Sequence, residues 1–285
     1  MFDLHSHILP GIDDGAVDVR TSIEMARAYV EQGVRGVACT PHILPGVYPN
    51  TGPRIRVEIE KLRQELSSAG IDLELYSGAD NHVAPDFVAA LAEGRLLSLA
   101  DSRYVLVEPP HHVAPPRLDA LFFQILSAGY VPVLTHPERL SWIEDKYALL
   151  ESLADRGAWI QVTSGSLRGV FGQRARYWSE KLLSEGRVHL LASDAHDLKR
   201  RRPDLLDGYR AAERLIGARE AESLVVTRPH GILSNMQSCE IPLPGTQRDS
   251  GSGAERGGGS NATGSIGGHS AVHSVVGRLR RRIFG

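Results

Sequence analysis

Two patterns of hydrophobic and polar positions alternate along most of the chain. Stretches that are apolar throughout, or at every second position, predict strands, whereas apolar residues spaced three and four apart predict amphipathic helices. The strand pattern occurs in Met1–His7, Val34–Cys39, Leu73–Ser77, Tyr104–Val107, Val131–Leu134, Trp159–Val162 and Val188–Ala192. The helix pattern follows each strand, in Thr21–Gln32, Pro53–Ala69, Pro85–Glu93, Leu118–Ala128, Lys146–Arg156, Arg174–Ser184 and Leu205–Ile216, with a last helix in Ala218–Val225.

This regular alternation of strands and helices predicts a parallel sheet with right-handed crossover connections. Polar residues follow each of the seven strands, which favours a closed barrel over an open, doubly wound sheet. We therefore predict an α/β fold, namely a distorted (β/α)7 TIM-like barrel. In barrels of this kind the reactive side chains gather at the carboxyl ends of the strands.

The composition changes near residue 235, so we predict one domain in residues 1–235 and a flexible tail in residues 236–285. Ser250–Gly268 is dominated by Gly, Ser, Ala and Thr and cannot bury enough apolar surface to offset its ordering entropy. Four arginines stand between apolar residues at the end of the chain: Arg278, Arg280, Arg281 and Arg282. They are interpreted either as a solvated basic tail or as a motif for an anionic membrane surface or an acidic partner.

The net charge and the cysteine content limit the expected binding partners and the expected cellular compartment. The formal net charge of -2 gives no reason to expect nucleic-acid binding. The two cysteines, Cys39 and Cys239, are far apart and suggest no disulfide framework, which favours a reducing compartment. No apolar stretch is long enough to span a bilayer, and no charged segment with an apolar run opens the chain. We expect a cytoplasmic protein without a nucleic-acid partner.

Potential metal ligands follow most of the predicted strands. His5 and His7 stand two apart at a strand end, so both imidazoles leave on the same side and provide half of a divalent-metal site. The further candidates are Asp14, His42, Asp80, Glu108, His136, Asp194 and His196. Each alone has an ordinary interpretation, such as a turn residue or a core histidine. All nine, however, are expected at the same end of the same barrel.

Nine nitrogen and oxygen donors are more than one ion needs, and they fit two or three ions bridged by a carboxylate. Glu108 is the predicted bridge because it is central in strand order. Buried carboxylates and imidazoles this close together would repel or stay unpaired without cations. The mixture of donors suits Mn²⁺, Fe or Zn²⁺ better than Ca²⁺. His111 and His112, in a proline-rich loop, could line the mouth of the site, and His189 is interpreted as structural.

These motifs resemble the PHP (polymerase and histidinol phosphatase) fold, and within it the manganese-dependent tyrosine phosphatases of bacterial capsule and exopolysaccharide clusters. The matching stretches are Asp3–Gly15, Thr40–His42, Gly78–Asp80, Thr135–Arg139, Gln161–Leu167 and Ser193–His196, within a match from Met1 to about Asn235. The resemblance implies a distorted barrel with a trinuclear metal site and all nine candidates as ligands. It also implies that Arg139 and Arg201 bind phosphate, and that the substrate is a cognate autophosphorylating tyrosine kinase controlling polysaccharide export.

The chain departs from the pattern of this family at several points, two of which concern the residues of the site. Asp80 stands where the family usually has Glu, which sets the carboxylate back by one bond, roughly 1.5 Å. Arg200, Arg201 and Arg202 are consecutive, so the pattern leaves open which of them faces the site.

Alternative functions stay open at this point. Hydrolysis of histidinol phosphate or another small phosphomonoester would use the same metal chemistry. The amidohydrolase class also begins with His-x-His, but it usually has a metal-bridging lysine after the fourth strand, where this chain has Glu108. Outside the enzymes, the chain could be a non-catalytic metal-binding scaffold that holds a kinase through its tail. A thiol phosphatase is disfavoured, because Pro45 stands where the Cys-x5-Arg motif would require arginine after Cys39.

Overall fold

All seven predicted strands are present in the computed structural model, which describes residues 1–245. They are β1 (Phe2–Ser6), β2 (Gly36–Cys39), β4 (Glu74–Ser77), β6 (Tyr104–Glu108), β7 (Val131–Thr135), β8 (Trp159–Thr163) and β9 (Leu190–Ala192). Two short strands, β3 (His42–Ile43) and β5 (Asp80–His82), come shortly after β2 and β4 and were not predicted. They are too short and too polar to produce a hydrophobic period.

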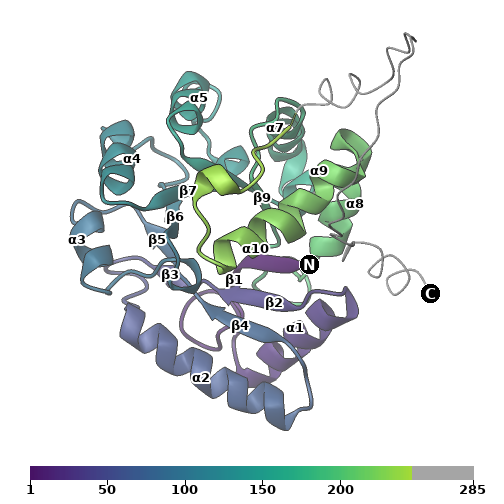
Figure 1. The fold of residues 1–285 in the computed structure, drawn as a ribbon. Coiled ribbons are helices and arrows are strands. Elements are labelled where there is room, and N and C mark those ends of the chain that lie inside the picture. Colours follow the sequence, from purple (N-terminus) through teal and green to yellow (C-terminus); the bar gives the residue numbers. More distant parts are fainter. Residues whose placement is uncertain (246–285) are drawn as a thin grey trace, which may run out of the picture. The chain divides into compact units, whose positions relative to one another are not determined.

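Every strand pair is parallel, and the strands curl around a common centre (Figure 1). The order is β1-β2-β4 in one sheet and β3-β5-β6-β7-β8-β9 in the other. The chain leaves the first sheet after β2 and after β4, and each time it pairs again in the second sheet as β3 or β5. A single bridge between Ser6 and Ala195 links the far edge of the second sheet to β1. This interrupted closure is the distortion expected of the predicted barrel.

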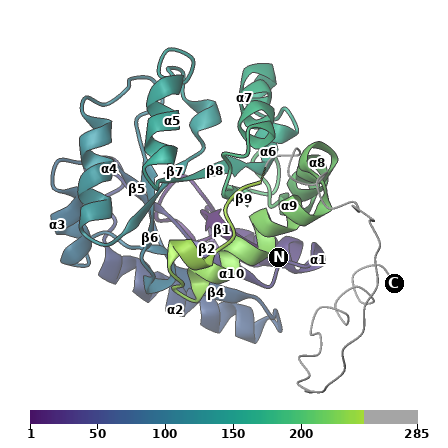
Figure 2. The ribbon, with the colours of Figure 1, turned by 45° about the horizontal axis from the view of Figure 1, so that its top comes forward.

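Helices cover the outside of the strands in both ribbon views (Figures 1 and 2). The α-helices of the described residues are α1 (Val19–Glu31), α2 (Gly52–Ser68), α3 (Phe87–Ala92), α4 (Leu118–Ser127), α5 (Tyr147–Asp155), α6 (Ser164–Leu167), α7 (Gly172–Ser184), α8 (Leu205–Ile216), α9 (Ala218–Glu222) and α10 (Arg228–Leu233). The helix expected in Ala218–Val225 continues through a π-helical turn, Ser223–Thr227, into α10. Within residues 1–245, none of the helices combines the length and hydropathy required to cross a bilayer.

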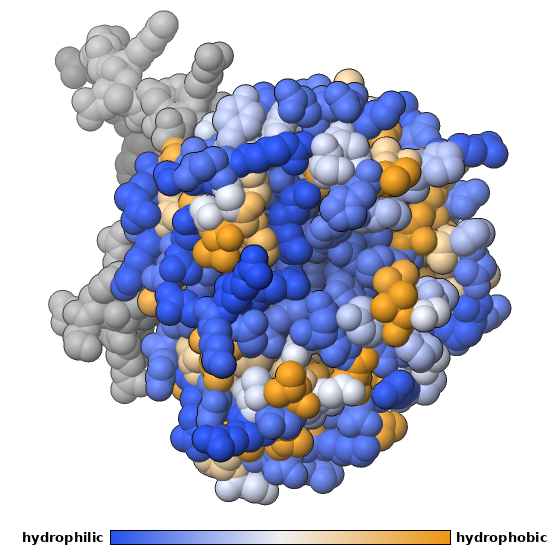
Figure 3. Space-filling model, turned by 180° about the vertical axis from the view of Figure 1, so that it is seen from behind, coloured by the Kyte–Doolittle hydropathy of each residue, from blue (hydrophilic) through white to orange (hydrophobic). Residues whose placement is uncertain are grey.

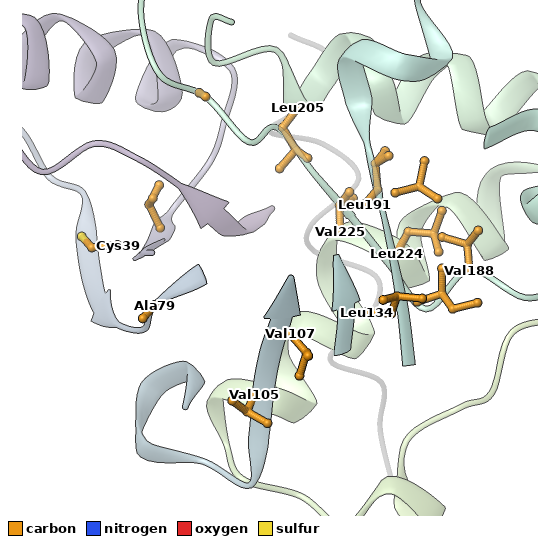
Figure 4. Close-up of a cluster of buried hydrophobic side chains, with 14 of the residues drawn as sticks. Cys39, Ala79, Val105, Val107, Leu134, Val188, Leu191, Leu205, Leu224 and Val225 are labelled. Atoms are coloured by element: carbon orange, nitrogen blue, oxygen red, sulfur yellow. The ribbon is translucent and has the colours of Figure 1, made fainter. Parts of the chain in front are cut away.

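The alternation of side chains along β6 shows how the core positions the site. Val105 and Val107 leave the strand on the same side and pack in the layer between strands and helices (Figure 4). Tyr104 and Leu106 point the other way, into a second apolar cluster at the centre of the barrel. Glu108 has the same parity as these two residues and is the last residue of the strand. The alternation that directs Tyr104 and Leu106 into the centre of the barrel therefore also places the Glu108 carboxylate at its carboxyl end.

The last described residues close the amino-terminal end of the barrel. Ile232 of α10 and Ile241 both belong to the central apolar cluster, and the hydroxyl of Tyr104 donates to the backbone carbonyl of Met236. The fold therefore continues past Asn235, the boundary that the composition suggested. The Gly-rich and Arg-rich parts of the predicted tail lie outside the described residues.

His189, interpreted above as structural, is buried just before β9 and stacks on Trp159. Its Nδ1 accepts a hydrogen bond from the backbone N–H of Ile160 at 3.2 Å. Burial, reinforced by the nearby Arg228, lowers the pKa of His189 to about 3. His189 takes up a proton near pH 6.5 in the unfolded chain, but in the folded chain it stays neutral at that pH. The free energy of unfolding therefore decreases as the pH falls from 6.5 towards 3.

We therefore expect His189→Asn, which keeps an acceptor for the N–H of Ile160, to reduce the loss of unfolding free energy at acidic pH. At pH 5 the titration of His189 costs wild type about 2 kcal/mol relative to neutral pH, and the variant should lack this loss. Urea unfolding of metal-free wild type and variant between pH 4 and 7 measures the difference. Parallel stability profiles for the two proteins would contradict the assignment.

Candidate functional site

All nine predicted ligands meet at the carboxyl ends of the strands. Strand register accounts for part of the convergence, because His42 of β3 pairs with Asp80 of β5, and His82 of β5 pairs with Glu108 of β6. The resulting groups of potential ligands overlap through shared residues: His7, Asp14, His42 and His196; His5, His7 and Asp80; His5, His136 and Asp194; His42, His82 and Glu108; and Glu108, His111 and His136.

The inner part of this cluster is fully buried. The Nε2 atom of His5 lies 3.4 Å from Oδ2 of Asp80 and 3.4 Å from Oδ1 of Asp194. Nε2 of His7 lies 3.3 Å from the same Asp194 oxygen. On β1 the register against β2 shifts between Asp3 and Ser6, an irregularity of the kind that redirects side chains. Two histidines and two carboxylates from three distant parts of the sequence thus face one another.

The loop after β1 brings Asp14 over this inner group, where it is the most exposed of the nine candidates. Its Oδ1 lies 3.4 Å from Nε2 of His42 and 3.4 Å from Nε2 of His196. The close fit of the loop requires Gly15, because a Cβ there would lie 2.1 Å from the carbonyl oxygen of His7. A glycine is therefore part of the geometry of the site.

Glu108 stands between two pairs of histidines, as expected of a bridging carboxylate. Its Oε2 lies 3.2 Å from Nδ1 of His42 and 2.5 Å from Nε2 of His82. Its Oε1 lies 3.1 Å from Nε2 of His111 and 3.6 Å from Nε2 of His136. Each oxygen of one carboxylate therefore faces its own pair of imidazoles.

Two arginines reach the cluster, and both contact the same atom. Nη1 of Arg139 and Nη2 of Arg201 each donate to Oδ2 of Asp194 at 2.5 Å, leaving Oδ1 for the histidines. Among the three consecutive arginines, Arg201 is thus the one that faces the site. Arg200 is exposed, and Arg202 pairs with Asp207. Figure 3, the view from behind Figure 1, shows a hollow lined by hydrophilic residues on the face opposite α10.

The pKa values of the histidines in the cluster are shifted in opposite directions. Burial alone would lower the pKa of His5, but the carboxylates of Asp80 and Asp194 overcome it and raise that pKa to about 9. Burial, with His7 as the next cause, instead lowers the pKa of His196 to about 4. Burial and the Arg139 guanidinium do the same for His136, whose pKa is lowered to about 4. At neutral pH these two imidazoles are uncharged and offer the lone pair that a metal requires.

Several buried atoms in the cluster have no hydrogen-bond partner among the described residues. They include both carboxylate oxygens of Asp80, Oδ1 of Asp194 and Nε2 of His196. A buried carboxylate without a partner is strongly unfavourable, and a cation would remove the penalty. The donors are imidazole nitrogens and carboxylate oxygens without cysteine, a set that Mn²⁺, Fe and Zn²⁺ accept. The residues present therefore fit a cluster of divalent cations.

The comparison with known proteins agrees with this geometry. The family described as "Capsular polysaccharide synthesis, CpsB/CapC" matches residues 1–234. The chain belongs to the CpsB/CapC family. It is 41% identical to the tyrosine-protein phosphatase YwqE of Bacillus subtilis (strain 168) over 201 residues, which cover 70% of this chain and 79% of YwqE. It is 29% identical to the tyrosine-protein phosphatase CpsB of Streptococcus pneumoniae over 242 residues, which cover 82% of this chain and 98% of CpsB.

A solved structure supports the family assignment at the level of the fold. It comes from crystallographic work on YwqE from Bacillus subtilis and CpsB from Streptococcus pneumoniae, described as unique metal-dependent tyrosine phosphatases. Its TM-score to this CpsB/CapC member is 0.80 at 36% sequence identity, and the match covers 86% of this chain and 100% of the other. The predicted PHP-type barrel is thereby confirmed.

Three residues of this CpsB/CapC chain that support the cluster were not predicted. Asp13 accepts a hydrogen bond from Nδ1 of His7 at 2.7 Å, and Gln161 accepts one from Nδ1 of His5 at 2.9 Å, so that each Nε2 is left facing the cluster. The third is His82. It stands two residues after Asp80, the same spacing as His5 and His7, and this spacing could have revealed it.

Cys39 is not suited to act as a nucleophile at this site. It is buried in β2, and burial raises the pKa of its thiol to about 12. A thiol that stays protonated is a poor nucleophile. Cys39 of this family member is therefore not activated as a nucleophile.

Proposed function

We propose that this chain is a metal-dependent protein-tyrosine phosphatase. The observation that carries the proposal is the set of buried, unpartnered donor atoms of Asp80, Asp194 and His196 beside two arginines. Membership of the CpsB/CapC family and the similarity to YwqE and CpsB, both named tyrosine-protein phosphatases, support it.

The nine ligands of the proposed centre are His5, His7, Asp14, His42, Asp80, Glu108, His136, Asp194 and His196. They are numerous enough for two or three ions, with Glu108 as the bridging carboxylate. We propose Mn²⁺ as the physiological ion, with Fe and Zn²⁺ as alternatives that the same donors accept. Asp80 is wholly buried, and its Oδ2 lies 3.5 Å from Nδ1 of His42 and 3.9 Å from Nε2 of His136. The shorter aspartate thus still lies within reach of the shared centre.

Bound divalent cations would supply a water nucleophile near neutral pH and neutralise charge on the phosphate oxygens. The chain itself provides the remaining parts of the reaction. Arg139 and Arg201 each use one N–H on Asp194, which leaves further N–H groups to hold the phosphate in a fork. Phe171 packs against the guanidinium of Arg139, 4.4 Å from the ring centroid, and fixes its orientation. The tyrosine leaving group has a pKa near 10, so its departure requires little help from an acid.

A phosphotyrosine-containing protein is the proposed substrate, and a bacterial tyrosine autokinase that regulates capsule or exopolysaccharide synthesis is the proposed partner. The family description and the names of the relatives are the support for this assignment. A cytoplasmic location is proposed from the two cysteines, neither of which forms a disulfide.

Turnover of a tyrosine-phosphorylated peptide, with and without Mn²⁺, tests the proposed function. We expect chelation to abolish hydrolysis of this peptide and of p-nitrophenyl phosphate, and added Mn²⁺ to restore both. Histidinol phosphate serves as the competing substrate, and we expect its kcat/KM to be at least about tenfold lower. Full activity after exhaustive chelation would reject the metal mechanism. Preferred turnover of histidinol phosphate would instead reassign the substrate, and no turnover of any substrate would favour a binding scaffold.

A further inference from the structure

His82 occupies a position at the mouth of the cluster that the nine proposed ligands do not account for. On β5, Asp80 and His82 project to one side, and Asn81 projects to the other. The side-chain amide of Asn81 donates to the carbonyl oxygens of Ala79, Leu97 and Leu106. These bonds anchor β5, and its register with β6 then places His82 directly beside Glu108.

Three donor atoms from three strands form a small triangle at this point. Nε2 of His82 lies 3.3 Å from Nδ1 of His42 and 2.5 Å from Oε2 of Glu108, and His42 Nδ1 lies 3.2 Å from the same oxygen. Ligands bound tetrahedrally at zinc distances are about 3.4 Å apart. Two edges of the triangle already have this length, and the third requires the small rotation of a side chain that is 16% exposed.

We propose that His82 and Glu108, with the Nδ1 side of His42, form an outer cation position at the mouth of the metal cluster. This inference rests on the proposed function, because it assumes that the inner ligands hold metal. Two imidazoles and one carboxylate make a donor set that zinc and related divalent ions favour. The position is also accessible, since the side chains of His42 and His82 are 12% and 16% exposed, whereas that of the inner His5 is fully buried.

The two ring nitrogens of His42 face different cation positions, and this predicts the order in which the inner and outer positions bind metal. Its Nε2 faces Asp14 at 3.4 Å, and its Nδ1 faces Glu108 and His82. A neutral imidazole has a single lone pair, so His42 ligates a cation on only one side at a time. When the Asp14 side is loaded, the outer cation keeps His82 and Glu108 and completes its shell with water. The outer position should therefore bind more weakly than the inner ones.

Zinc titration of the metal-free full-length chain tests this assignment. Equilibrium dialysis with metal analysis should show a tight class of bound Zn²⁺ and a weaker class in wild type. We expect His82→Ala to lose about one equivalent from the weaker class and to keep the tight class. A Co²⁺ titration followed by visible absorption should show the same loss. His230→Ala is the matched control, because His230 lies beside Phe2 at the opposite end of β1.

A second variant separates metal ligation from mere positioning of Glu108. The amide of His82→Gln can still donate a hydrogen bond to the carboxylate but is a poor ligand, so we expect it to bind zinc as His82→Ala does. Unchanged zinc stoichiometry in His82→Ala, or full recovery in His82→Gln, would overturn the outer position. Wild-type protein that binds no metal at all would overturn the proposed function itself, a result that is distinguishable from the other two.

Discussion

Replacing His136 with alanine is expected to lower kcat/KM on a phosphotyrosyl peptide by about a thousandfold or more at saturating Mn²⁺. The imidazole is buried and neutral, with Nε2 3.6 Å from Oε1 of Glu108 and 3.9 Å from Oδ2 of Asp80. Of the two imidazoles that face this Glu108 oxygen, His136 is the buried one, and it also approaches Asp80. The metal content of the purified variant should decrease as well, which ties the loss to ligation.

The backbone at His136 calls for a second variant. Its φ of 32° lies in the left-handed region, where alanine is strained by about 1 kcal/mol and asparagine is better tolerated. His136→Asn should therefore keep its thermal stability and still lose activity. His112→Ala, which removes an exposed histidine from the neighbouring loop, should leave kcat/KM unchanged. Robust turnover by either His136 variant would reject the assigned role.

Arg201→Ala is expected to lower kcat/KM by about a hundredfold to a thousandfold while the bound metal stays constant. Its guanidinium donates to Asp194 at 2.5 Å and has further N–H groups free to hold a phosphate oxygen. Arg201→Lys should recover only part of the activity, because an ammonium group cannot form a planar fork. Steady-state kinetics and metal analysis of the same preparations provide both readouts.

The neighbouring arginine offers a matched control for this experiment. Arg202 carries the same charge one residue later, but it is exposed and pairs with Asp207 at 3.5 Å. Arg202→Ala should therefore behave as wild type, because an exposed ion pair contributes little. Equal activity of the Arg201→Ala and Arg202→Ala variants would show that the phosphate clamp lies elsewhere.

Much of the fold followed from local pattern. Seven strands and the helices between them were predicted because each buries a regular face, and that periodicity can be recognised in consecutive residues. The short elements β3, β5 and α6 were not predicted. They have between two and four residues, mostly polar, and they form because tertiary pairing holds them in place. For the same reason, a change in composition does not reveal the contacts that bury Ile241 beyond the predicted boundary at residue 235.

The candidate site divides in a similar way. The nine candidate ligands could be selected from the sequence because parallel strands that alternate with helices present all their carboxyl ends on one face, so position in the chain implied position in space. The spacing of His82 from Asp80 pointed to the same end of the barrel, but its proximity to Glu108 depends on the register of β5 against β6. Arg201 could not be separated from Arg200 and Arg202 until the loop after His196 was folded.

Local patterns in the sequence were enough to predict the barrel, the end of it that carries the chemistry, and the donor atoms collected there, because side-chain period and strand order are local properties of the chain. Which donor atoms face one another depends instead on the folded arrangement of the whole domain. It placed Glu108 between two pairs of histidines, turned Arg139 and Arg201 onto one oxygen of Asp194, and set His82 at the mouth. These contacts join segments far apart in the chain. Their distances are fixed by sheet register and by packing, which no single stretch of residues encodes.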